Sequence, residues 1–379
     1  MMASIVAGRR TPVAVRGGKF AEAEIADLAG PVMAQSLRDA GVQPDRVDAV
    51  ILGNALYGGG NPARVAALAA GLPESVAAMT VDTQCCSGLD AIALARAQIL
   101  SGQAEVVIAG GVESYSRAPI RQRRPRSPLE PPQSYERPPF TPWPERDPDM
   151  LEAAAALALR LKVSRERQAE YAVLSHRRAS GDLLSSEEIV AIGDVARDEF
   201  TRHLTPALCA RLNVLAGEST CGVTAATTAV EADAAAVVVV VGDGVLRTLG
   251  LNGREVGILS ADACGGDPEC PALAPIAAAN AALSRAGLRA RDIDVAEIME
   301  AFAVQAMACV EGIGLDLERV NRRGGALARG HPIGASGAIL AVRLFHDLRR
   351  GNTDRYGLAA IAAAGGLGSA LVLAAGDGA

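Results

Sequence analysis

The apolar positions of the chain form short runs that alternate with longer amphipathic segments, a pattern typical of strands followed by helices. The run from Ala234 to Val241 is wholly apolar and of strand length, which predicts a buried strand. LDAIALARAQIL (89–100) and AILAVRLFHDL (338–348) have the length and apolar character of helices. This alternation predicts an α/β fold in which helices cover mixed or mostly parallel sheets.

The α/β pattern occurs twice. LRDAGVQPDRVDAVILGNAL (37–56) aligns without gaps to LSRAGLRARDIDVAEIMEAF (283–302). Each segment contains a helix end, an Ala-Gly cap, a polar turn, an aspartate and then a strand. Ser87-Gly88 and Ser336-Gly337 open the apolar helices that come next, and each helix leads to a strand and a glycine pair. Three blocks in one shared order predict two similar half-domains.

Residues 117–148 interrupt this plan because they are rich in arginine and proline. Proline at this density excludes long helices and interior strands. An extended surface loop, a cationic rim for a phosphorylated carrier and a clamp between subunits all fit the composition. Helical patterns come after it, so the insertion is predicted to be mostly helical. The predicted units are an N-terminal half (1–116 plus 230–250), an inserted loop domain (117–229) and a C-terminal half (251–379).

The bulk composition excludes several classes of protein. The 379 residues carry a net charge of -6, which gives no support for nucleic-acid or membrane-surface binding. We expect no secretory signal, because MMASIVAGRRTPVAV (1–15) lacks a long apolar run before a cleavage site, and the apolar runs of the sequence are too short to cross a bilayer. The seven cysteines show no CxxC or Cys/His metal spacing. We therefore expect a cytoplasmic enzyme with reduced cysteines, no metal and no cofactor.

The segment TVDTQCCSGLDAIALA (80–95) contains a candidate nucleophile. A strand runs into a sharp turn, and Cys85 lies at or just before the start of a helix. Backbone N–H groups and the helix dipole at that position stabilise a thiolate, which predicts a lowered pKa for Cys85. The N–H of Cys85 can also donate to an oxyanion. The alternative is that Cys85 is a small core residue.

A histidine in the second half strengthens this interpretation. NRRGGALARGHPIGASG (321–337) places His331 in a glycine-rich turn before the partner helix of the repeat. Pseudo-symmetry brings such turns together, and a Cys–His pair is what thiol catalysis needs. We interpret His176, His203 and His346 as surface or satisfied core residues.

These segments resemble the motifs of the thiolase family almost from end to end. The similar stretches are RTPVAVRGGKF (10–20), GGGNPARVAALAAGLP (58–73), CCSG (85–88), AGGVESYS (109–116), MEAFA (299–303), GGALARGHPIGASG (324–337) and GGLGSA (365–370). The resemblance implies a thiolase fold, with a five-layer αβαβα core of two duplicated half-domains and an inserted loop domain. It also implies a homodimer or tetramer and an acyl thioester of CoA or of an acyl carrier protein as substrate.

The resemblance also implies roles for single residues. Cys85 takes the acyl group, and His331 activates Cys85 and helps to stabilise an oxyanion. Backbone N–H groups near Cys85 and Gly366 also hold an oxyanion. The residues that we predict to contact the substrate are Ser87, Gly88, Thr227, Glu300, Phe302 and Pro332.

The sequence departs from the family at catalytic positions. Ala362 stands where the family has its second cysteine, which removes a proton from the incoming thioester. Met299 replaces an asparagine that orients a water in the other oxyanion site. Thr227 and Ala229 stand where the family has Asn and Ser near CoA, which puts free CoA as the carrier in question.

These departures leave three hypotheses. The first is a specialised condensing or acyl-transfer enzyme that loads Cys85 and passes the acyl group to an acceptor without a base at position 362. The second is an ordinary acetyl-CoA acetyltransferase or 3-ketoacyl-CoA thiolase with Cys86 or Glu300 as a relocated base. The third is a non-catalytic acyl-binding or scaffold subunit.

Overall fold

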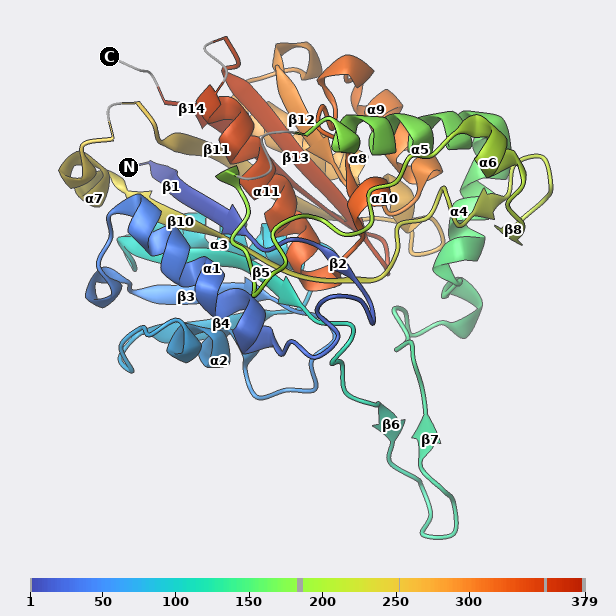
Figure 1. Ribbon diagram of the computed structural model, residues 1–379, viewed down its shortest axis with the longest axis horizontal. Coiled ribbons are helices and arrows are strands. Elements are labelled where there is room, and N and C mark those ends of the chain that lie inside the picture. Colours follow the sequence, from blue (N-terminus) through green and yellow to red (C-terminus); the bar gives the residue numbers. More distant parts are fainter. Residues whose placement is uncertain (1, 183–186, 252, 351–352, 377–379) are drawn as a thin grey trace.

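The long apolar run forms strand β10 (Ala232–Gly242), and all eleven of its residues are buried. It pairs antiparallel with β1 (Ala3–Arg10) on one side and β5 (Val106–Glu113) on the other. The computed structural model, shown in Figure 1, describes residues 2–182, 187–251, 253–350 and 353–376. Within these residues β10 lies near the middle of a ten-stranded mixed sheet.

The sheet consists of two halves joined at one short contact. The N-terminal half continues from β5 to two parallel strands, β3 (Ala49–Gly53) and β4 (Ala77–Val81). The C-terminal half contains β11 (Val256–Gly265), β14 (Leu367–Ala375), β13 (Tyr356–Ala363) and β12 (Val295–Ile298). Ser4 pairs with Gly257 and Ile5 with Val256, so β1 and β11 join the two halves.

Helices separate the two half-sheets and cover their outer faces. Between the sheets lie α3 (Ser87–Leu100) and α11 (Ile333–Arg350), whose apolar side chains share one core with residues of both halves. On the outside, α1 (Ile25–Ala40) and α2 (Pro62–Ala69) cover the N-terminal half, and α8 (Ala274–Ala286) and α9 (Ala303–Ile313) cover the C-terminal half. The five-layer αβαβα arrangement that the resemblance implies is therefore confirmed.

Matching residues of the two repeats make matching contacts. Asp48 accepts hydrogen bonds from Glu105 N (2.7 Å) and Val106 N (2.9 Å) where β5 begins. Asp294 does the same for Arg355 N (2.8 Å) and Tyr356 N (3.0 Å) where β13 begins. Gly41 and Gly287 end α1 and α8 with φ of 67° and 70°, a left-handed conformation that favours glycine.

The two central helices cross at their glycines. A Cβ atom on Gly88 would lie 2.7 Å from Ala338 N, and one on Gly337 would lie 2.6 Å from Leu89 N. Neither clash can be relieved by a rotamer change, because the atoms in the way belong to the backbone. Both glycines thus allow the N-terminal ends of α3 and α11 to touch, which brings the residues before the two helices together.

The segment 117–229 contains the helices α4 (Met150–Leu161), α5 (Arg165–Ser180) and α6 (Pro206–Ala210). Residues 117–148 contain no α-helix, as their prolines predict, and their strands β6 (Gln122–Arg123) and β7 (Gln133–Ser134) form an arm that projects from the body (Figure 1). The remaining elements are β2 (Ala14–Val15), η1 (Pro44–Arg46), η2 (Pro144–Arg146), β8 (Val214–Ala216), β9 (Val223–Thr224), α7 (Asp243–Leu249), η4 (Pro271–Leu273), η5 (Ala290–Asp292), η6 (Leu317–Arg319) and α10 (Ala326–Arg329).

One side of the sheet ends in a free strand. β4 is the last strand there, and its Met79 is 45% exposed. An open edge can pair with a strand of a second copy, and the homodimer stays a prediction. None of the helices in the described part of the chain is long and apolar enough to cross a membrane.

Candidate active site

Cys85 lies in a tight turn between β4 and α3. Gln84, the residue before it, has φ of 54°, a left-handed conformation that is unfavourable for a side chain with a Cβ. Asp82 Oδ1 accepts from Gln84 N (3.0 Å), and Ser87 Oγ accepts from Thr83 N (2.9 Å) while donating to Gln84 O (2.5 Å). These bonds hold a strained turn that places Cys85 just before the helix.

His331 faces Cys85 from the turn before α11. Its Nε2 lies 3.1 Å from Cys85 Sγ, and the two residues are 246 positions apart, the offset of the internal repeat. His331 Nδ1 lies 2.7 Å from Ser336 Oγ, and that hydroxyl donates to Pro332 O (2.9 Å). Because the Ser336 proton goes to Pro332, Ser336 accepts from Nδ1–H. The lone pair of Nε2 then points at the thiol.

The residues before His331 are fixed by buried charges. Arg329 Nε donates to Asp198 Oδ2 (2.9 Å), and its Nη2 donates to Asp182 Oδ2 (3.1 Å). His331 N itself donates to Val230 O (2.7 Å). The main chain on either side of the imidazole is therefore tied to the core.

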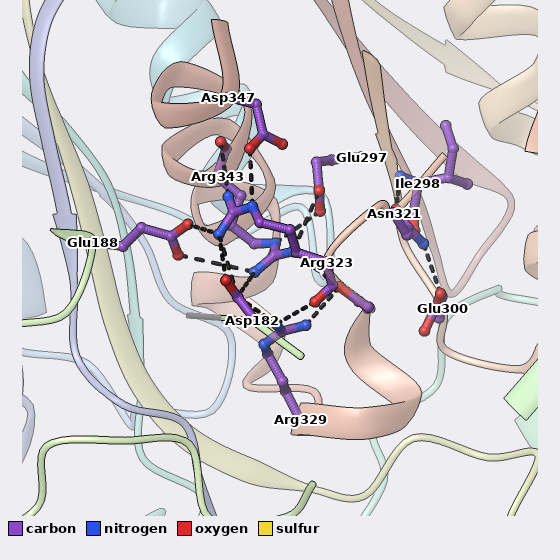
Figure 2. Close-up of polar contacts among 12 residues, drawn as sticks. Asp182, Glu188, Glu297, Ile298, Glu300, Asn321, Arg323, Arg329, Arg343 and Asp347 are labelled. Carbon is purple, nitrogen blue, oxygen red and sulfur yellow. Dashed lines mark hydrogen bonds and ion pairs between the residues drawn. The ribbon is translucent and has the colours of Figure 1, made fainter. Parts of the chain in front are cut away.

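Arg329 belongs to a larger network of buried ion pairs, of which Figure 2 shows the central part. Arg343, on α11, donates to Glu297 Oε2 (2.9 Å), and Arg323 donates to Asp347 Oδ1 (2.9 Å). Burial alone would raise the pKa of Asp198, but the charges of Arg10 and Arg329 lower it to about 2. The network joins β1, β12, α11 and the His331 turn behind the site.

The pKa values of the pair correct one sequence prediction. Burial raises the pKa of the Cys85 thiol to about 12, and hydrogen bonds from the backbone N–H groups of Cys85 and Ala364 offset only part of this rise. Burial lowers the pKa of His331 to about 4. The helix start was expected to lower the pKa of Cys85, but burial outweighs it. At neutral pH the pair is a thiol next to a neutral imidazole. The thiol therefore transfers its proton to that imidazole while the sulfur attacks the thioester, and not before.

Two backbone N–H groups converge on the Cys85 sulfur, those of Cys85 and Ala364. Such a pair can stabilise the oxyanion that forms when a thioester is attacked. The sequence placed the second donor in the backbone region of Gly366. Gly366 has φ of 83°, and its carbonyl accepts from Gly266 N (2.6 Å), which holds this glycine loop in place. Ala364, two residues nearer to β13, reaches the site.

Cys85 and His331 open onto a cavity of about 600 Å³. Most of its wall is apolar and includes several small side chains. Residues from both halves and from the inserted segment contribute, among them Leu56, Phe140, Met150, Ala153, Ala272, Phe302, Ile333 and Ala362. The space suits a flexible, mostly apolar acyl chain with a thioester near Cys85.

Of the predicted substrate contacts, the structure places only Phe302 on the cavity wall. Ser87 is buried in the Cys85 turn, Gly88 packs against α11, and the Pro332 carbonyl accepts from Ser336. Thr227 Oγ1 accepts from Thr224 N (2.9 Å) inside a turn, so its neighbours Thr228 and Ala229 line the cavity in its place. In this structure these small or polar residues take part in packing and turn formation, and their contact with the substrate stays a prediction.

Neither residue considered as a relocated base lies on the cavity wall. Cys86 is fully buried and its thiol faces Ile361 O (3.5 Å). Glu300 accepts from Ser175 Oγ and from Asn321 Nδ2, both at 2.7 Å, and the latter bond is visible in Figure 2. Ala362 does line the cavity, whereas Met299 is buried in the central core.

Several residues of the site were not found from the sequence. Ser336 orients His331 although it was noted only as the start of a repeated helix. Glu113, in the AGGVESYS motif, accepts from Ala55 N and Gly334 N, both at 3.0 Å, and so joins the turn after β3 to the start of α11. Tyr115, two residues later, lines the cavity. The sequence feature that could have identified Tyr115 as a site residue is its position just after a buried strand.

Comparison with known proteins agrees with this geometry. Residues 3–244 match the model of the thiolase N-terminal domain, and residues 254–375 match that of the thiolase C-terminal domain. The chain belongs to the thiolase family. It is 39% identical over 377 residues to YhfS of Bacillus subtilis (strain 168), provisionally named an acetyl-CoA C-acetyltransferase, with 98% of this chain and 99% of YhfS covered.

Two other relatives are also similar over nearly their full length. VraB of Staphylococcus aureus (strain MW2), with the same provisional name, is 36% identical over 380 residues, covering 97% of this chain and 98% of VraB. The crystal structure of the Bacillus anthracis acetyl-CoA acetyltransferase superposes with a TM-score of 0.91 at 32% identity, covering 99% of this chain and 98% of that one. The thiolase fold predicted from the sequence is thus confirmed by a structural match that covers 99% of the chain.

Proposed function

We propose that this thiolase-family protein is an acyltransferase that carries its acyl group on Cys85. The observation that supports this most strongly is the 3.1 Å contact between Cys85 Sγ and His331 Nε2 at the wall of a largely apolar cavity. A nucleophile within hydrogen-bond reach of a base, with the base oriented by a third group, is the arrangement that covalent acyl transfer requires. Ser336 supplies the third group.

The proposed loading step uses only groups that meet at the Cys85 sulfur. Cys85 Sγ attacks the thioester carbon as its proton passes to His331 Nε2. The N–H groups of Cys85 and Ala364 stabilise the oxyanion. The C–S bond to the carrier then breaks, and the carrier thiolate takes the proton from His331. The products are acyl-S-Cys85 and a free carrier thiol, either CoA or the thiol of an acyl carrier protein.

The fate of the acyl group after loading distinguishes the two catalytic hypotheses. Ala362 lines the cavity at the position where the family has the cysteine that acts as a catalytic base, and an alanine cannot accept a proton. A specialised transfer or condensation therefore fits the site better than ordinary thiolysis. The names of the relatives favour the second candidate, acetyl-CoA C-acetyltransferase activity. Either reaction makes the protein an enzyme and not a scaffold.

The decisive experiment is the intact mass of the protein after incubation with acetyl-CoA, hexanoyl-CoA and hexanoyl-loaded acyl carrier protein. We expect the mass to rise by one acyl group, and Cys85→Ala to abolish the rise because no other described residue of the cavity wall has a thiol. Cys264→Ala, at a partly buried cysteine outside the cavity wall, is the control and keeps the adduct. Wild-type protein that stays unmodified by all three donors would leave the scaffold hypothesis standing.

Restoring the missing cysteine tests the choice between the two reactions. We expect Ala362→Cys to raise the rate of CoA-dependent cleavage of 3-ketohexanoyl-CoA by about 10²-fold, the lower end of what a general base contributes. Ala272→Cys adds a thiol elsewhere on the same cavity wall and is expected to leave the rate low. The measurement is the loss of 3-ketoacyl-CoA absorbance. Fast cleavage by the wild type would favour the ordinary thiolase.

A further inference from the structure

Two positions that the thiolase family uses to handle the second substrate of a condensation carry apolar side chains in this chain. Ala362 is apolar, and Met299 is 1% exposed in the central core. The N–H groups of Cys85 and Ala364 are assigned to the acyl group on Cys85. An acceptor thioester that becomes a carbanion places negative charge on its own carbonyl oxygen, and this charge needs a separate donor.

Tyr115 is positioned to be that donor. It lies just beyond the end of β5, and the Cys85 turn lies just beyond the end of β4. Both strands run parallel to β3, so these two residues leave the sheet at the same edge. Tyr115 lines the cavity together with Cys85 and Ala362.

The hydroxyl of Tyr115 is available to a ligand. Among the residues that the structure describes, none forms a hydrogen bond with it. The backbone around it is held, because Ser116 N donates to Asp233 Oδ1 (3.0 Å) and Ser114 Oγ donates to Ala23 O (3.1 Å). Burial, Cys85 and Glu231 raise the pKa of Tyr115 above its ordinary value, so the phenol keeps its proton. At neutral pH the hydroxyl is therefore a hydrogen-bond donor and not a base.

We infer that the Tyr115 hydroxyl donates a hydrogen bond to the carbonyl oxygen of the acceptor thioester as that acceptor becomes an enolate. The inference rests on the proposed acyl-S-Cys85 intermediate. With a malonyl thioester as acceptor, the bond to the carboxylate breaks and CO₂ leaves, and the electron pair passes to the carbanion and its enolate oxygen. The carbanion forms a C–C bond to the acyl carbon. The C–S bond to Cys85 breaks, and the thiolate takes a proton from solvent through His331.

This assignment gives Tyr115 an effect on one half-reaction only. Loading of Cys85 uses the two backbone donors and no enolate, so it does not need the phenol. Attack on acyl-S-Cys85 by hydroxylamine also forms no enolate. Condensation with malonyl-CoA or acetyl-CoA does form an enolate and therefore needs the phenol. A tyrosine that merely supports the fold would affect all three reactions together.

The test compares wild type, Tyr115→Phe and Tyr57→Phe after loading with hexanoyl-CoA. Tyr57 is 41% exposed and lies outside the cavity wall, so Tyr57→Phe removes a tyrosine hydroxyl at a position away from the cavity. We expect Tyr115→Phe to load Cys85 and to release hexanoyl hydroxamate at wild-type rates. We expect its transfer to malonyl-CoA to fall about 10²–10³-fold, the usual effect of losing one oxyanion donor. Tyr57→Phe should match the wild type throughout.

Three results would overturn the inference. They are condensation by Tyr115→Phe at the wild-type rate, an equal loss of loading and condensation, and a wild-type adduct that reacts with hydroxylamine but with neither malonyl-CoA nor acetyl-CoA. All three leave the acyl-enzyme proposal intact, because wild-type Cys85 is loaded in each. A wild-type protein that forms no adduct would instead overturn the acyl-enzyme proposal on which the inference rests.

Discussion

Replacing His331 by alanine is expected to slow the acylation of Cys85 by about 10²–10⁴-fold, the range over which a positioned general base contributes. The reason is the protonation state of the pair. Burial raises the pKa of Cys85 to about 12, so the nucleophile is a thiol at neutral pH and needs a proton acceptor during attack. His331 Nε2, 3.1 Å from Sγ, is positioned to be that acceptor. Time-resolved intact mass after mixing with acetyl-CoA measures the rate.

The same pair gives a characteristic pH dependence. Burial lowers the pKa of His331 to about 4, so the imidazole is neutral and able to accept a proton above that pH. We expect acylation to be flat between about pH 6 and pH 9 and to fall below about pH 5, as the imidazole becomes protonated. A pre-formed thiolate of ordinary pKa would give a rate that rises through about pH 8 instead.

A matched control is His203→Ala, because His203 is exposed and lies outside the cavity wall. It should acylate at the wild-type rate. If His331→Ala also kept the wild-type rate, the thiol would have to lose its proton to another group. The role assigned to the 3.1 Å contact would then be wrong.

Replacing Arg343 by methionine is expected to lower the free energy of unfolding by about 3–5 kcal/mol, the usual result of breaking a buried ion pair from one side. Methionine keeps most of the apolar stem of the side chain but removes the charge. Glu297, which is 0% exposed and accepts from Arg343 Nε at 2.9 Å, would be left as a buried carboxylate without its main partner. The midpoint of urea unfolding, followed by circular dichroism, measures the change.

The control for this variant is Arg117→Met. Arg117 Nε donates to Glu24 Oε1 at 2.9 Å, a similar distance, but both side chains are 50% exposed. Because solvent screens exposed pairs, this variant should cost less than about 1 kcal/mol. Adding Glu297→Leu to Arg343→Met should recover part of the lost stability, since it removes the unpaired charge. Equal effects of the two arginine variants would show that burial does not strengthen the pair.

The predicted elements whose cause is local were found where the sequence placed them. The apolar run at 234–241 became β10, and the prolines of 117–148 excluded α-helix from that arm. The internal repeat could be recognised in the sequence because each copy needs the same aspartate and the same glycine cap to form the same turn. Asp48 and Asp294 make equivalent contacts for this reason.

The side chains that line the cavity were harder to predict, because a sequence shows that a residue is near a motif but not where its side chain points. Thr227 and Glu300 are each next to a cavity residue in the sequence, yet both are bonded inside the fold. Tyr115 and Ala364 reach the site because strand ends and loop geometry place them there. These positions depend on how the sheet and its loops are arranged.

The sequence by itself therefore determined the repeated α/β plan, the thiolase resemblance and the candidate pair Cys85 and His331. These depend on apolar periodicity, turn chemistry and motif order, all of which are properties of the chain. Tertiary structure decided the protonation of that pair, since burial moves the pKa of Cys85 up to about 12 and that of His331 down to about 4. It also decided which N–H groups face the sulfur and which side chains line the cavity, because segments far apart in the chain must pack together before any of these neighbours exist.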